Sequence, residues 1–138
     1  MHHSLHLPVV LPLYAAGAAW TLVYDTIYAH QDAADDARLG VGSTALRFGG
    51  HTKAVLGAFS LAMLAGLAAA GQAAGTGPGL YGGLAAAAAH LAWQLTSVDI
   101  GNRADCGAKF RANAGLGGLV FAALVAGKLT EAGGPFAL

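Results

Sequence analysis

Four long apolar segments constrain this chain more than any other feature of its sequence. They cover residues 8–30, 53–71, 79–98 and 113–129. A helix of about 20 apolar residues crosses the hydrocarbon core of a bilayer, and each segment is close to that length. Only helices and closed barrels satisfy the backbone in lipid, and no alternating pattern supports a barrel. The sequence therefore predicts an all-α integral membrane bundle of about four transmembrane helices.

The composition agrees with a lipid environment. Hydrophobic residues make up 56% of the 138 residues and charged residues only 10%, whereas soluble domains average about 25% charged. The formal net charge is zero, so no basic surface for nucleic acid is expected. The lipid bilayer is the partner that this composition predicts.

The basic residues are distributed unevenly between the two ends of the predicted bundle. If all four segments span, the polar connections 31–52 and 99–112 fall on one side. Six of the seven basic residues belong to that side, and only Lys128 lies on the other. The positive-inside rule then places the basic side in the cytoplasm or the mitochondrial matrix. We expect a bacterial plasma membrane or a mitochondrial inner membrane protein.

The acidic residues crowd at the end of the first apolar segment. The stretch YDTIYAHQDAADDARLGVGSTALRFG contains Asp25, Asp32, Asp35 and Asp36, four of the seven acidic residues. Continued as a helix, it places Asp25, Asp32 and Asp36 within about 40° of one another. Such carboxylates repel unless a cation lies among them, and Mg²⁺ binds carboxylates together with substrate phosphates. A solvated loop is the alternative interpretation of these aspartates, for Asp35 and Asp36 more than for Asp25 and Asp32.

Three patterns in this stretch carry a resemblance to a known family. They are Y-D-T-x-Y-A, the D-x-x-x-D of Asp32 and Asp36, and G-x-x-S-T-A-x-x-F-G. The stretch resembles the second aspartate-rich motif of the UbiA-type prenyltransferase superfamily, in the branch that acts on 4-hydroxybenzoate. Residues 90–121, HLAWQLTSVDIGNRADCGAKFRANAGLGGLVF, are similar to the late loop and last helix of that family. The resemblance covers most of the chain.

The resemblance implies a membrane bundle of about nine helices with two aspartate motifs facing a central cavity. Such enzymes use Mg²⁺ to transfer a polyprenyl group from polyprenyl diphosphate to the ring of 4-hydroxybenzoate in ubiquinone biosynthesis. By position, the resemblance makes Asp32 and Asp36 the catalytic residues, which hold Mg²⁺ through the diphosphate. The prenyl chain length stays open, and so does the choice between 4-hydroxybenzoate and a related aromatic acceptor.

Further residues are candidates for substrate binding. The resemblance gives supporting roles to Asp25, Tyr28 and Asp35. Arg38 and Lys53 follow the aspartates and have two interpretations: they pair with the diphosphate, or they are ordinary basic residues of the inner side. On the third apolar segment, His90, Trp93 and Gln94 either line a cavity or serve as an interfacial anchor and a helix–helix hydrogen bond.

One departure from the family bears on function. The first motif of the family, N-D-x-x-D-x-x-x-D, does not occur, and four spans fall short of nine. We therefore expect residues 1–138 to form a single partial membrane domain, the C-terminal half of the fold, that is inactive alone. The alternative is a non-catalytic membrane remnant that binds partner helices or polyprenyl lipid. A soluble isoprenyl synthase would share the metal chemistry, but four lipid-compatible segments argue against it.

Overall fold

The computed structural model describes residues 6–29, 51–99 and 102–132. It contains four helices: α1 (Leu7–Ala29), α4 (Thr52–Ala73), α5 (Gly79–Ser97) and α6 (Arg103–Leu129). Every regular element in the described ranges is a helix, so the prediction of an all-α helical bundle is confirmed. Three of the four, α1, α4 and α6, are long and apolar enough to cross a membrane by length and composition. The 19-residue α5 is the shortest of the four.

The start of α6 differs from the sequence prediction. Residues 103–112 were expected to be part of a polar loop, but they form about three helical turns that precede the apolar segment. Asn102 caps this helix, because its side chain accepts a hydrogen bond from the backbone N–H of Asp105. Asp105 also pairs with Lys109 one turn later, at 3.0 Å. Local capping and pairing therefore extend the helix beyond its apolar part.

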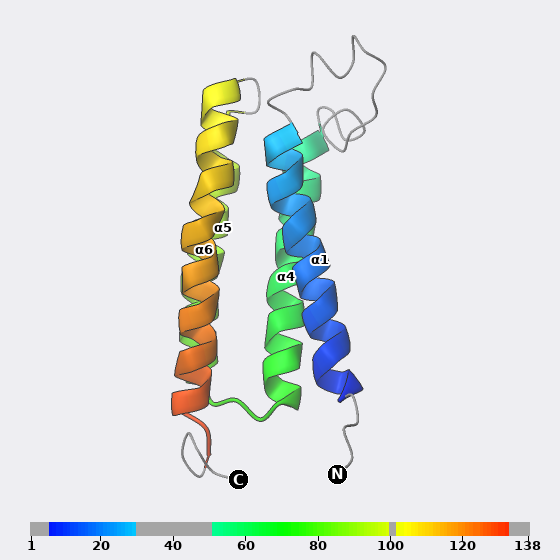
Figure 1. The fold of residues 1–138 in the computed structure, drawn as a ribbon, viewed down its shortest axis with the longest axis vertical. Coiled ribbons are helices and arrows are strands. Elements are labelled where there is room, and N and C mark those ends of the chain that lie inside the picture. The colour runs from blue at the N-terminus through cyan, green and yellow to red at the C-terminus, as the bar shows by residue number, and fades with distance from the viewer. Residues whose placement is uncertain (1–5, 30–50, 100–101, 133–138) are drawn as a thin grey trace.

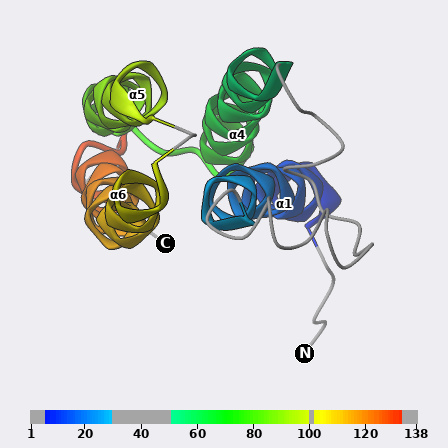
Figure 2. The ribbon, with the colours of Figure 1, turned by 90° about the horizontal axis from the view of Figure 1, so that it is seen from above.

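The helices form two antiparallel pairs that stand side by side (Figures 1 and 2). Helix α1 packs along α4, and α5 packs along α6, while α1–α6 and α4–α5 make the smaller contacts between the pairs. A tight turn at residues 74–78 joins α4 to α5, and Gly75 adopts a positive φ of 78° there. The end of α1 and the starts of α4 and α6 lie together at the opposite end. We call this opposite end the cationic end, because it carries Lys53, Arg103, Lys109 and Arg111.

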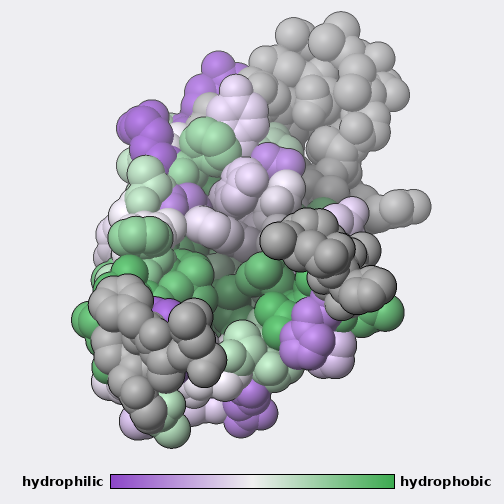
Figure 3. Space-filling model, turned by 60° about the horizontal axis from the view of Figure 1, so that its bottom comes forward, coloured by the Kyte–Doolittle hydropathy of each residue, from purple (hydrophilic) through white to green (hydrophobic). Residues whose placement is uncertain are grey.

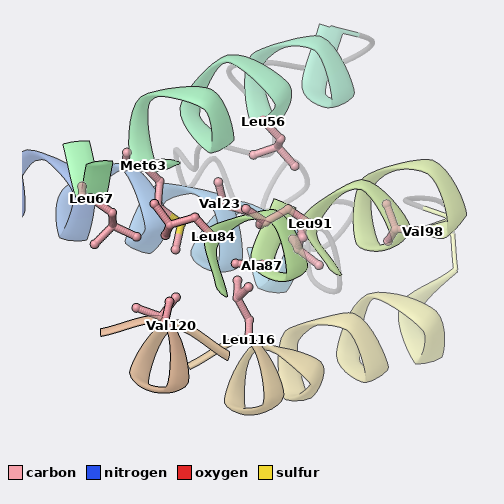
Figure 4. Close-up of a cluster of buried hydrophobic side chains, with 14 of the residues drawn as sticks. Val23, Leu56, Met63, Leu67, Leu84, Ala87, Leu91, Val98, Leu116 and Val120 are labelled. Atoms are coloured by element: carbon pink, nitrogen blue, oxygen red, sulfur yellow. The ribbon is translucent and has the colours of Figure 1, made fainter. Parts of the chain in front are cut away.

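Leucine, valine, alanine and methionine side chains fill the space between the helices (Figure 4). Leu84, Ala87 and Leu91 of α5 belong to the same buried cluster as Leu116 of α6 and Met63 of α4. Glycines let the backbones approach closely within each pair. A methyl group added at Gly66 of α4 would lie 2.7 Å from the carbonyl oxygen of Pro12 in α1, and one at Gly83 would overlap Ala123.

Large apolar side chains also cover much of the outer surface. Tyr14 is 78% exposed, Leu61 70% and Phe121 68%. In the space-filling view, apolar residues form a band across the visible face, and most hydrophilic ones lie at its upper left and along the bottom (Figure 3). Water-soluble monomers rarely expose contiguous apolar surface of this kind. This surface fits contact with lipid or with further transmembrane helices.

Candidate functional site

The structure brings three of the sequence-predicted site residues to the cationic end. Asp25 and Tyr28 lie on the last two turns of α1, and Lys53 lies on the first turn of α4; all three side chains are exposed. The other four predicted residues, Asp32, Asp35, Asp36 and Arg38, lie outside the described residues. The predicted magnesium site therefore depends on the segment that continues directly from Asp25 and Tyr28.

Within the described ranges, no group of three or more histidine, cysteine, aspartate or glutamate side chains could hold a metal ion. Asp25 is the carboxylate of α1 nearest to the aspartate motif in the sequence. Its oxygens are of the type that Mg²⁺ prefers. The other carboxylates of the predicted magnesium site, Asp32, Asp35 and Asp36, lie outside the described residues, so that site stays a prediction.

A row of aromatic side chains extends along the last turns of α1 and meets α6. The ring of Trp20 lies 6.0 Å from that of Tyr24, edge to face. The ring of Phe110, on α6, lies 5.9 Å from Tyr24 and 4.7 Å from Tyr28. Such edge and tilted arrangements are the favourable geometries of aromatic pairs. We call Trp20, Tyr24, Tyr28 and Phe110 the aromatic row.

Only Tyr28 of this row was predicted from the sequence. A usable signal exists, because Trp20, Tyr24 and Tyr28 recur every four residues and so share one face of a helix. Phe110 could not be added by the same reasoning. It comes from α6, and its place beside Tyr28 depends on how the two helices pack.

A pocket of about 390 Å³ opens between α1 and α6 at the aromatic row. Its walls are almost entirely apolar, and Arg111 and Asn113 supply the polar groups (lining residues Trp20, Tyr24, Phe110, Arg111, Asn113 and Ala114). We call it the upper pocket. An apolar hollow with a guanidinium at its margin can hold a molecule that has a hydrocarbon body and an anionic end.

A second pocket of about 280 Å³ lies farther from the cationic end. It is lined by α1, α4 and α6 (Leu13, Ala16, Gly17, Trp20, Met63, Leu67, Val120 and Leu124). We call it the lower pocket. None of its lining side chains is charged, so it suits a hydrocarbon and not a phosphate.

A buried amide pair connects three helices behind the upper pocket. Asn113 Nδ2 donates to Gln94 Oε1 at 3.0 Å, and Gln94 Nε2 lies 3.5 Å from Asn113 Oδ1. Trp20 Nε1 donates to the same Asn113 oxygen at 3.0 Å, and His90 Nδ1 lies 3.0 Å from Gln94 Nε2. Gln94 therefore makes a helix–helix hydrogen bond, which was one of its two predicted interpretations, while Trp93 is exposed.

Charged groups surround the start of α6. Lys109 is buried, and its Nζ lies 3.0 Å from Asp105 Oδ1 and 4.7 Å from the centre of the Trp93 ring. Asp105 Oδ2 accepts a hydrogen bond from the backbone N–H of Asp99 at 2.7 Å. The Asp105 contact holds Asp99, which follows α5, against the start of α6. Arg111, which is exposed, is the cation that lines the upper pocket.

Comparison with known proteins adds independent evidence. Residues 1–126 match the UbiA prenyltransferase family. The chain is 49% identical over 125 residues to "4-hydroxybenzoate polyprenyltransferase, mitochondrial" of Arabidopsis thaliana, which covers 91% of this chain and 31% of the relative. It is 50% identical over 121 residues to the Homo sapiens protein of the same name, covering 88% of this chain and 33% of the relative.

The Drosophila melanogaster protein of that name is 48% identical over 128 residues, which is 93% of this chain and 33% of the relative. The chain thus spans about a third of the length of the curated relatives it matches. No solved structure matches the chain significantly. The similarity places the aromatic row and the buried amide pair within the matched region.

Proposed function

This chain belongs to the UbiA prenyltransferase family, and we propose that it forms one wall of an aromatic prenyltransferase site. The site transfers a polyprenyl group from polyprenyl diphosphate to the ring of 4-hydroxybenzoate, as the names of its relatives indicate for those proteins. The product belongs to ubiquinone biosynthesis. Three helices suited to a membrane, and relatives named mitochondrial, support an integral protein of the mitochondrial inner membrane or the equivalent bacterial membrane.

One observation carries this proposal: the upper pocket lies between α1 and α6, close to the end of α1 after which the aspartate motif follows in the sequence. Helix α1 contributes Trp20 and Tyr24 to the pocket and then continues into the sequence that contains Asp32 and Asp36. We expect an apolar tail in the pocket to direct its diphosphate toward the cationic end, which carries Arg111 and Lys53. Arginine suits this position because its guanidinium presents a planar array of donors to phosphate oxygens.

The side chains of this chain have separate tasks in the proposed reaction. The C–O bond between the prenyl group and the diphosphate breaks, the ring carbon of the acceptor takes the prenyl group, and the ring loses a proton. Mg²⁺, held by Asp32 and Asp36 through the diphosphate, would supply Lewis-acid assistance to the leaving group. The faces of Tyr24, Tyr28 and Phe110 would stabilise the allylic cation by about 0.5–2 kcal/mol per ring.

A binding experiment with the 138-residue chain in lipid nanodiscs tests the proposal. We expect geranyl diphosphate to bind in the presence of Mg²⁺ and to dissociate when EDTA is added. Asp32→Asn and Asp36→Asn should each weaken binding about 10- to 100-fold, since a charge-assisted contact is worth about 1.5–3 kcal/mol. Glu131→Gln is the matched control, because Glu131 lies at the opposite end of the bundle, paired with Lys128.

The proposal would be wrong if both aspartate variants bound geranyl diphosphate as tightly as the unmodified chain. Binding that did not respond to EDTA would contradict a role for the metal. The proposal would then be reduced to an apolar site for polyprenyl lipid. An equal loss in Glu131→Gln would point to a general effect of charge or folding instead of a diphosphate site.

A further inference from the structure

Trp20 is the residue that the upper and the lower pocket have in common. We infer that Trp20 closes the lower end of the upper pocket and thereby limits the length of prenyl chain that binds within the protein. This inference rests on the proposed function, because it assumes that a prenyl diphosphate occupies the upper pocket. It adds a residue that determines specificity for the substrate.

The polarity of the two pockets sets the direction of a bound chain. Arg111 lines the upper pocket, whereas the lining of the lower pocket contains no charged side chain. A diphosphate therefore lies at the upper pocket, toward the cationic end, and the hydrocarbon extends from there toward Trp20. A longer chain must continue into the lower pocket, between Leu13, Met63 and Leu124, or leave the groove.

Hydrogen bonding fixes the indole in this dividing position. Its Nε1–H donates to Asn113 Oδ1 at 3.0 Å, and Asn113 is itself held by Gln94 and by the carbonyl oxygen of Lys109, each at 3.0 Å. Gln94 is fully buried and Asn113 is 7% exposed. Rotating Trp20 aside would leave a partly buried indole N–H and the Asn113 side-chain oxygen short of a partner, which is costly in an apolar surrounding.

Packing restricts the ring on the side of α6 as well. Gly117 faces the indole: a methyl group added there would lie 3.4 Å from Trp20 Cη2 and 3.9 Å from Cζ2. On its own helix, Tyr24 contacts the ring from the cationic side. The ring thus has neighbours on α1 and on α6, so it forms a fixed wall between the pockets.

The side chain of Trp20 is large enough to matter for chain length. Its removal would join cavities of about 390 Å³ and about 280 Å³ into one groove along α1 and α6. Because lipid tails are themselves apolar, length discrimination in a membrane comes from shape and not from hydrophobic transfer. A rigid wall at Trp20 supplies such a restriction of shape.

The test measures how affinity depends on chain length in nanodiscs with Mg²⁺, using thiolodiphosphate analogues of geranyl, farnesyl and geranylgeranyl diphosphate. In the unmodified chain, we expect affinity to stop rising, or to fall, for the longer analogues. Trp20→Ala should improve binding of the longest analogue about tenfold relative to geranyl. Trp20→Phe keeps a ring but loses the hydrogen bond, so it should give an intermediate length profile.

Trp93→Phe is the matched control, because Trp93 is exposed, lines neither pocket and is the only other tryptophan. Its length profile should equal that of the unmodified chain. It also leaves Trp20 as the sole indole, so fluorescence of this variant should change when a thiolodiphosphate binds. This readout tests whether the hydrocarbon reaches Trp20 independently of any catalysis.

The outcomes separate the inference from the proposed function. Equal changes for all three chain lengths in Trp20→Ala, or no fluorescence response despite binding, would overturn the role of Trp20 and leave the proposed function standing. No binding of any analogue to the unmodified chain would overturn the proposed function and this inference together. A circular dichroism spectrum and melting temperature close to those of the unmodified chain establish that Trp20→Ala folds.

Discussion

Asn113 joins α1, α5 and α6 through side-chain hydrogen bonds. Its amide accepts from Trp20 and donates to Gln94 and to the backbone of its own helix. All four hydrogen-bonding atoms of the Asn113 and Gln94 amides have partners. In an apolar surrounding, a satisfied pair of this kind holds helices in register, whereas a broken one exposes unpaired polar groups.

We expect Asn113→Leu to lower the free energy of unfolding by about 2–4 kcal/mol, because it leaves the buried Gln94 side-chain oxygen and the Trp20 N–H without partners, whereas Gln94 Nε2 keeps His90. Equilibrium unfolding in mixed detergent micelles measures the change. Thr96→Val is the matched control: Thr96 is exposed and bonds only to the Ala92 carbonyl of its own helix, so its effect should stay within about 0.5 kcal/mol. Equal effects of the two variants would contradict a special role for the amide pair.

Part of the site could be predicted from single residues. The placement of Asp25, Tyr28 and Lys53 at one end followed from the direction of two apolar segments. The pairing of Gln94 with Asn113 did not follow, because these residues lie 19 positions apart on two helices. Which polar groups meet depends on the rotation of each helix about its axis, and hydropathy alone does not determine that rotation.

Two neighbouring glycines of α5 lie on different faces of the helix: Gly83 faces α6, and Gly82 does not. A methyl group added at Gly83 would overlap Ala123 of α6, whereas one added at Gly82 would meet nothing within 4 Å. These neighbours in sequence form a matched pair for testing the α5–α6 contact. They have the same helical propensity and differ in what they face.

We expect Gly83→Ala to destabilise the protein by about 1–3 kcal/mol, the usual cost of overpacking. Gly82→Ala should be neutral or should stabilise the protein by up to about 1 kcal/mol, because alanine favours a helix more than glycine does. Thermal unfolding in detergent, followed by circular dichroism, compares the two. The packing of α5 on α6 would be in doubt if Gly83→Ala melted at the same temperature as Gly82→Ala or higher.

At the level of elements, hydropathy predicted the existence of all four helices and misplaced one boundary. It failed at residues 103–112 because charged side chains hide a helix from a hydropathy scale. A signal for the start of α6 was nonetheless present in the sequence. Asn102 followed three residues later by Asp105 is a pattern typical of a helix N-cap. Attention to caps would have found the first turns of α6.

The whole molecule is polarised along its long axis. Among the described basic residues, four lie at the cationic end, and Lys128 lies near the opposite end with Glu131. This agrees with the sequence prediction that the two polar connections share one side of the membrane. Which helices would pair was not predicted, because four antiparallel segments allow several arrangements and the close glycine contacts that select one are not apparent from hydropathy.

Thiol labelling of two variants tests the membrane orientation. Ala74→Cys lies in the turn after α4 and Arg103→Cys at the start of α6, so they should label from opposite sides of the membrane. With expression in bacteria, a membrane-impermeant maleimide should reach Arg103→Cys only in inverted vesicles and Ala74→Cys only in right-side-out vesicles. The unmodified chain measures the background, because its one cysteine, Cys106, is buried. Labelling of both sites from one side would contradict the arrangement of α4, α5 and α6.

The pairing of α5 with α6 has a consequence for how the chain is made. Helix α5 is the one described helix that is not apolar and long enough to qualify as a span alone, and it carries His90 and Gln94. If α5 moved from the translocon into lipid alone, burying its His90 and Gln94 side chains in hydrocarbon would cost free energy. Asn113 of the following helix satisfies Gln94, so α5 becomes compatible with lipid once α6 has been synthesised. Helices α5 and α6 would then insert into the membrane together, as a helical hairpin. In this process α6 would act as an intramolecular chaperone for α5.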